Sequence, residues 1–132
     1  NTPYDGPPST GQFIWPVTGG YISQYFSRYH VAIDYAGRGN IYGKPIYAAD
    51  DGRVVFAGSA GSYGLLIKVD HGNGLMTWYA HCSDISPVSV GKNVKQGEII
   101  GKVGATGNAR GAHLHFEVTE YGVKKNPLNY LP

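Results

Sequence analysis

The chain has 132 residues, a length that suits one domain around a single hydrophobic core and is too short for two. A formal charge of +2 gives no basis for nucleic-acid binding, and 42% hydrophobic residues exclude a disordered chain. No apolar run approaches the roughly 20 residues that span a bilayer, so we expect no transmembrane segment. The single cysteine excludes an internal disulfide, while 20 glycines, 8 prolines and 11 tyrosines favour short strands and tight turns.

The beginning of the chain differs in composition from the rest. Residues 1–12 are rich in Pro, Gly, Ser and Thr without periodicity, which predicts a linker or an extended arm. The chain starts at Asn1 without a basic and apolar leader, so we expect a processed product or an excised domain. Residues 13–132 are expected to form the folded domain, with the apolar segments 13–17 and 21–26 as a strand pair or the wall of a cleft.

The next informative stretch, residues 29–35, reads Tyr-His-Val-Ala-Ile-Asp-Tyr. In an extended strand His30 and Asp34 would face one side about 13 Å apart, too far to share a metal ion whose ligand bonds are about 2 Å. They can bind one ion only if the chain bends between them, and the small Ala32 would let the backbone come near. Considered alone, His30 is typical of a surface imidazole and Asp34 of a turn acceptor.

The middle of the chain predicts two strand-turn-strand units. Residues 45–58 read as one unit, with Asp51 and the following glycine as a hairpin turn, so the acidic side chain there serves the turn rather than catalysis. Segments 65–69 and 75–79 form the clearest hairpin, and His71 belongs to its turn.

An apparent internal duplication predicts the fold class. Residues 90–104 faintly echo residues 43–58, because each half has an apolar strand, a glycine turn and a second apolar strand. We therefore expect an all-β domain of two antiparallel sheets in a duplicated, barrel-like sandwich with an open groove.

A third histidine follows the second hairpin strand. Alternation places His81 on the face of Tyr79 and opposite Ala80 and Cys82, so its side chain can point into a cleft. Cys82 points away from that cleft, which favours a small buried hydrophobe over a metal ligand.

The late segment 111–118, Gly-Ala-His-Leu-His-Phe-Glu-Val, alternates between polar and apolar residues. In a half-buried strand His113, His115 and Glu117 share one face, and the two histidine Cα atoms lie about 6.5 Å apart. Both imidazoles can then act on one metal ion, or on a ligand and its bound water. A lone histidine there would usually be structural, but two with a third upstream predict a metal site.

These motifs resemble, in their order along the chain, those of the lysostaphin-type zinc metallo-endopeptidases that cleave peptidoglycan. They are His30-x-x-x-Asp34, the Tyr-Ala-His segment ending at His81, and the His-Leu-His segment of residues 113–115. By pattern the resemblance extends over residues 13–131. The resemblance implies that His30, Asp34 and His115 bind one zinc ion per domain, whereas His81 and His113 stand beside it as catalytic residues. Strand alternation alone does not make that distinction.

Three positions depart from the family pattern. Ala32 stands where glycine is common, Asn108 and Ala109 stand where a Ser or Thr pair is common, and Cys82 replaces leucine. None of these changes removes a side chain that does chemistry. They bear on substrate fit more than on activity.

The implied ligand set predicts a catalytic site. Two imidazoles and one carboxylate leave an open fourth position, and zinc held there lowers the pKa of bound water to about 7 and polarises a carbonyl. The chain has no His-Glu-x-x-His motif, so we expect one of His81 and His113 to accept the water proton and the other to stabilise the oxyanion or protonate the leaving amine. Glu117 either orients an imidazole or forms an edge salt bridge, and Tyr25 or Tyr29 either contacts the oxyanion or packs.

The resemblance thus implies an endopeptidase that hydrolyses amide bonds in peptidoglycan stem peptides or cross-bridges. It implies a monomeric catalytic domain of a larger extracellular or envelope protein from a bacterium or phage. Two alternatives stay open: an inactive peptidoglycan-binding or scaffold module on the same fold, and a phosphocarrier that uses paired histidines. The first predicts gaps in the His/Asp set, and the sequence has none; the second has no need of Asp34 beside His30.

Overall fold

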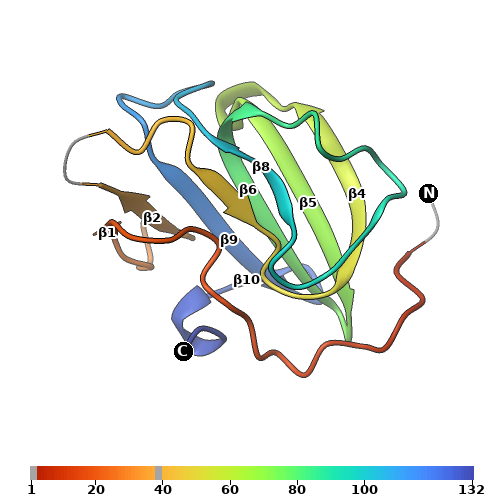
Figure 1. The fold of residues 1–132 in the computed structure, drawn as a ribbon. Helices are drawn as coiled ribbons and strands as arrows, with labels where there is room; N and C mark the ends of the chain where they lie inside the picture. Colours follow the sequence, from red (N-terminus) through yellow and green to blue (C-terminus); the bar gives the residue numbers. More distant parts are fainter. Residues whose placement is uncertain (1–2, 38–39) are drawn as a thin grey trace.

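The computed structural model describes residues 3–37 and 40–132 and is built almost entirely from β-strands (Figure 1). Within these ranges, no helix has the length and apolarity needed to cross a membrane. The strands are β1 Tyr21–Gln24, β2 Ile33–Ala36, β3 Pro45–Tyr47, β4 Gly52–Ser59, β5 Leu65–Gly72, β6 Leu75–Asp84, β7 Asn93–Val94, β8 Ile99–Val103, β9 Leu114–Glu120 and β10 Val123–Lys125, with short 3₁₀ helices η1 Gly61–Tyr63 and η2 Pro127–Asn129.

The strands form an antiparallel sheet that folds over itself. Its main path runs β1-β2-β9-β6-β5-β4-β7, and β8 leaves this path by pairing with both β6 and β3. Figure 1 shows β8 in front of β5 and β6, and a Cβ on Gly101 of β8 would come within 3.2 Å of Ile67 on β5. The predicted all-β antiparallel fold is confirmed, and its two layers are joined by continuous strand pairing around one core.

One predicted hairpin is confirmed and the other is wrong. Strands β5 and β6 pair as expected across the turn at Asn73 and Gly74, which take φ values of 52° and 74°, as hairpin turns of this type require. The turn at Asp51, by contrast, joins β3 to β4, and these strands do not pair with each other: β3 pairs with β8, whereas β4 pairs with β5 and β7. The position of the turn was predicted correctly. The pairing partner of each strand is instead decided by segments that are distant in sequence.

The segment before β1 also differs from the prediction. Residues 13–17 form no strand pair with 21–26; β1 pairs with β2 instead. The Phe13 amide donates to the carbonyl of Tyr130, and the Phe13 ring enters the core at 3% exposure. Residues 3–12 contain no helix or strand, and Ser9 fastens them to the domain by donating from its amide to the His71 carbonyl. The boundary of the catalytic domain at residue 13 stays a prediction.

The core lies on one face of β9, as alternation predicted. Leu114, Phe116 and Val118 are fully buried, and the ring of Phe116 packs on that of Tyr79 at a centroid distance of 5.4 Å. Cys82 is also fully buried, and this burial raises the pKa of its thiol to about 12. Cys82 is therefore an apolar packing residue, as predicted, and the opposite face of β9 is left for polar side chains.

His71 lies inside β5 and is fully buried, rather than in the turn that the sequence predicted. Its Nδ1 lies 2.8 Å from the carbonyl oxygen of Asp51 and its Nε2 lies 2.7 Å from the Thr77 hydroxyl. A carbonyl can only accept, so Nδ1 carries the proton and Nε2 accepts from Thr77. Burial lowers the pKa of His71, against the opposing effect of the bond to Asp51 and the nearby carboxylates.

We expect this histidine to make folding stability depend on pH. Below about pH 6.5 the unfolded chain binds a proton at His71 that the folded chain resists, so the free energy of unfolding falls as the pH falls, by up to about 1.4 kcal/mol per pH unit. Urea denaturation between pH 5 and pH 8 should show a flatter profile for His71→Gln than for the wild type. Identical slopes would contradict this assignment.

Candidate metal centre

The polar face of the sheet carries the predicted site where β2, β9 and β6 lie side by side. Asp34 on β2 is the direct antiparallel neighbour of His115 on β9, and His115 is in turn the neighbour of Ala80 on β6. Side chains of direct neighbours in a sheet are about 5 Å apart and share a face. Strand register alone therefore brings Asp34 and His115 together from positions 81 residues apart in sequence.

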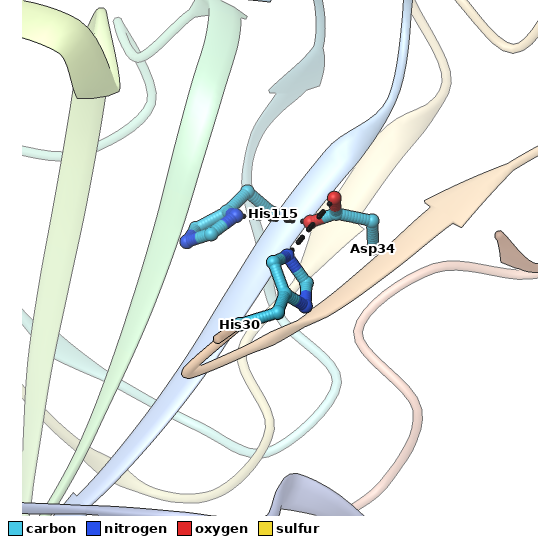
Figure 2. A group of neighbouring side chains, drawn as sticks. All are labelled: His30, Asp34 and His115. Carbon is cyan, nitrogen blue, oxygen red and sulfur yellow. Dashed lines mark hydrogen bonds and ion pairs between the residues drawn. The ribbon is translucent and has the colours of Figure 1, made fainter. Parts of the chain in front are cut away.

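His30 joins them because the chain bends where the spacing required a bend. Reciprocal backbone hydrogen bonds between Ser27 and His30 close a tight turn, and residues 31–32 form a bend before β2 begins. Figure 2 shows His30 below Asp34, with its ring turned toward the carboxylate. Its Nε2 lies 3.2 Å from Asp34 Oδ2.

The three side chains fit a metal ion. One ligand atom from each of His30, Asp34 and His115 lies within 4.8 Å of the others. Asp34 Oδ2 lies 3.2 Å from His30 Nε2, and Asp34 Oδ1 lies 2.9 Å from His115 Nδ1. Tetrahedral bonds of about 2.0–2.2 Å place ligand atoms roughly 3.3–3.5 Å apart, so only small side-chain shifts are needed. The side chains keep 12–15% of their surface exposed, which leaves the centre open to solvent.

His115 is held between two carboxylates. Its Nδ1 lies 2.9 Å from Asp34 Oδ1, and its Nε2 lies 2.7 Å from Glu117 Oε2. Burial opposes the charged imidazole, but the bonds to Asp34 and Glu117 raise the pKa of His115 to about 9. Burial likewise opposes the charge on Asp34, yet the bond from His115 and the nearby histidines hold its pKa below the ordinary value. Asp34 is therefore a carboxylate at neutral pH, the form that binds metals.

His81 reaches the site by a route that alternation did not predict. Tyr79 on β6 pairs with Ile67 and Cys82 pairs with Leu65, so β6 contains an extra residue, a β-bulge. His81 lies in this bulge with a left-handed φ of 62°. Tyr79 is buried in the core, so the prediction that His81 shares its face is wrong. The ring centroid of His81 lies 4.8 Å from that of His113.

Three of the site histidines bind a backbone carbonyl through Nδ1, which leaves Nε2 as the ring nitrogen available to the centre. In each, Nδ1 lies 2.7–3.1 Å from a backbone carbonyl oxygen, which can only accept, so Nδ1 carries a proton. Burial lowers the pKa of His81, with His113 adding to the effect and the bond to Thr106 opposing it. The histidines and their carbonyl partners are His30 with Tyr25, His81 with Thr106, and His113 with Gly111.

His113 stands at the edge of the cluster. It precedes β9 at an isolated bridge to Gly104, and its Nε2 lies 3.9 Å from Asp34 Oδ2, farther than the nearest nitrogens of His30 and His115. The geometry thus groups the three residues expected to bind metal and leaves His81 and His113 beside them. The chemical roles of the five residues stay predictions.

Other predicted and unpredicted residues surround the centre. Tyr25 and Tyr29 are 60% and 88% exposed, and their contact with an oxyanion stays a prediction. Tyr63 of η1 was not predicted, because no motif marks it; its ring centroid lies 5.9 Å from that of His115. Burial and the Glu117 carboxylate raise the pKa of Tyr63 to about 12. Lys124, the ion-pair partner of Glu117, was likewise not predicted.

Known proteins share this fold and much of this sequence. The DD-carboxypeptidase/endopeptidase Mpg of Neisseria meningitidis is 42% identical over 77% of the chain and 23% of its own length. A lipoprotein NlpD/LppB homolog of Pseudomonas aeruginosa is 37% identical over 99% of the chain and 43% of its own length. The murein hydrolase activator EnvC of Escherichia coli is 34% identical over 92% of the chain and 29% of its own length. The chain thus spans less than half the length of these relatives.

Solved structures agree with the sequence comparison. A putative peptidase M23 from Pseudomonas aeruginosa has a TM-score of 0.85 at 35% identity. The match covers 95% of the present chain and 52% of the Pseudomonas chain. The catalytic domain of lysostaphin from Staphylococcus simulans has a TM-score of 0.69 at 29% identity. The match covers 86% of the present chain and 87% of the lysostaphin domain. The resemblance to lysostaphin-type enzymes is confirmed. Because residues 28–127 also match the model of peptidase family M23, the chain belongs to this family.

Proposed function

We propose that this domain is a zinc-dependent endopeptidase that hydrolyses amide bonds in peptidoglycan stem peptides or cross-bridges. The observation that carries the proposal is a complete constellation: three metal donors within 4.8 Å of one another, with the rings of His81 and His113 beside them. Membership of a peptidase family supports hydrolysis as the reaction class. The identity of the scissile bond is part of what the experiment below determines.

The donor set favours zinc over magnesium and calcium. Two imidazoles and one carboxylate form a mixed nitrogen and oxygen site, whereas magnesium and calcium prefer oxygen ligands alone. Zinc bound there would polarise the scissile carbonyl and lower the pKa of a water molecule. His30 offers Nε2, Asp34 a carboxylate oxygen, and His115 the Nδ1 that faces Asp34.

The residues beside the donors supply proton transfer. Burial holds His81 in its neutral form, so its Nε2 can accept a proton at neutral pH. His113 lies next to it with a 20% exposed side chain, where it can reach either the oxyanion or the leaving amine. Glu117 accepts from His115 Nε2 and fixes the orientation of that ring. We assign the base to this pair of histidines without dividing the two roles between them.

The relatives support a place in the bacterial cell envelope. One is named a lipoprotein and another a murein hydrolase activator, and Mpg is named a carboxypeptidase/endopeptidase. We therefore propose that the domain acts outside the cytoplasm on peptidoglycan peptides, as one part of a larger chain.

A second candidate is a module that activates another hydrolase. The name of EnvC favours this alternative, because that relative matches 92% of the chain. A module that had lost catalysis would be expected to lack metal donors or their neighbouring histidines. Here His30, Asp34, His81, His113 and His115 are all present and gathered, which favours the enzyme.

The deciding experiment is digestion of purified walls of defined peptide chemistry. The zinc-loaded domain should release fragments whose masses show cleavage within a stem peptide or a cross-bridge, and a chelator should stop the release. If no wall is cut although zinc is bound in a 1:1 ratio, the enzyme proposal is wrong. Stimulation of an added wall amidase in that case would favour the activator.

A further inference from the structure

We infer that Lys124 is a positioning residue for the metal ligand His115, acting through the buried carboxylate of Glu117. This inference rests on the proposed metal centre, because it concerns how firmly that centre holds its ion. Lys124 lies on β10, outside every motif that marked the site, and its ammonium forms an ion pair with Glu117 Oε1.

Strand register places the lysine. β10 pairs with β9 so that Lys124 lies opposite Thr119, which makes Glu117 its diagonal neighbour on the same face. A diagonal neighbour in a sheet is about 7–8 Å away at the backbone, within reach of a long side chain. The next residue, Lys125, is exposed and follows on the alternate face. β10 thus aims one lysine at Glu117.

Glu117 has both oxygens engaged and almost no contact with water. Its side chain is 1% exposed; Oε2 lies 2.7 Å from His115 Nε2, while Oε1 binds Lys124. A carboxylate removed from water needs a compensating charge, and one deprived of its partner is strongly destabilised. The neutral Tyr63 hydroxyl, which also hydrogen-bonds Glu117, does not balance the buried charge. Without the ammonium we therefore expect Glu117 to shift toward water and to loosen its hydrogen bond with His115.

An aromatic ring holds the lysine in place. The Lys124 ammonium lies 3.6 Å from the centroid of the Trp78 ring, and Trp78 is the cross-strand neighbour of Glu117 on β6. Tyr63 packs against the same ring at a centroid distance of 5.5 Å and against His115 at 5.9 Å. The cation–π contact adds to the ion pair and restricts the ammonium to a position between the Trp78 ring and Glu117.

Positioning and simple electrostatics predict opposite effects of removing this charge. By Coulomb's law, loss of a positive charge near a divalent cation site strengthens cation binding. If instead Lys124 fixes Glu117 and through it the His115 ring, its loss weakens binding, as loss of outer-shell partners typically does by about 10–100-fold. The direction of the change in zinc affinity therefore distinguishes positioning from simple electrostatics.

The test is the zinc dissociation constant, measured by competition with a chromophoric chelator on folded protein. Lys124→Met should weaken zinc binding about tenfold, Lys124→Arg should restore it to near the wild-type value, and the matched control Lys125→Met should leave it unchanged. In a Glu117→Gln background, Lys124→Met should have little further effect, because its route to the metal is already cut. Melting temperatures without zinc identify any variant that is simply misfolded.

Tighter or unchanged zinc binding in Lys124→Met, or an equal effect in both backgrounds, would overturn the inference. These outcomes are independent of the enzyme proposal. A wild-type domain that binds zinc but cuts no wall refutes the proposed reaction while the effect of Lys124 is still measured. A wild-type domain that binds no zinc refutes both.

Discussion

Replacing Asp34 with asparagine is expected to abolish stoichiometric zinc binding and, with it, wall hydrolysis. Asp34 lies within 4.0 Å of three imidazoles: its oxygens are 3.2 Å from His30, 3.9 Å from His113 and 2.9 Å from His115. The amide has the same shape but no charge, so the change removes the carboxylate ligand and leaves the packing. We expect a loss of zinc affinity beyond the about 10–100-fold typical of outer-shell changes.

The measurement is zinc content after dialysis, together with the chelator competition described for Lys124. Asp84→Asn is the matched control, since Asp84 ends β6 and caps a turn by accepting from the Ser86 amide. A domain that keeps one zinc ion and full hydrolysis after Asp34→Asn would show that the metal donors are misassigned.

Replacing His81 with asparagine should separate catalysis from metal binding. Asparagine tolerates the left-handed backbone that His81 adopts at φ 62°, so the bulge should persist. It cannot exchange a proton at neutral pH, and loss of a general acid or base costs about 10²–10⁴-fold in rate. We expect hydrolysis to fall by this factor with zinc retained, because His81 lies outside the group of three donors.

Rates should be measured on the wall or peptide substrate that mass spectrometry identifies, with zinc content determined on the same samples. His113→Asn is the companion variant, and a comparable loss there would support a shared role for the two rings. Undiminished hydrolysis in His81→Asn would show that His81 has no part in proton transfer. Loss of zinc in that variant would instead make His81 a ligand.

The sequence by itself determined which candidate residues to look for, and it predicted which face of β9 is polar. Period-two alternation from His113 to Val118 separated the polar face from the core face, because side chains of a strand point alternately to its two sides. The His30 to Asp34 spacing likewise required a bend, since about 13 Å of extended strand cannot share one ion. Both features are local, so they are visible in a short stretch of chain.

Tertiary structure decided what depends on strand partners distant in sequence. β3 pairs with β8 instead of with β4, and the bulge that contains His81 arises where β6 pairs with β5. Lys124 reaches Glu117 only because β10 pairs with β9 in one register. A lysine or a histidine has the same local sequence signal whichever way it points. Only the packing of the layers gives such a side chain its direction, and with it a place at the candidate site.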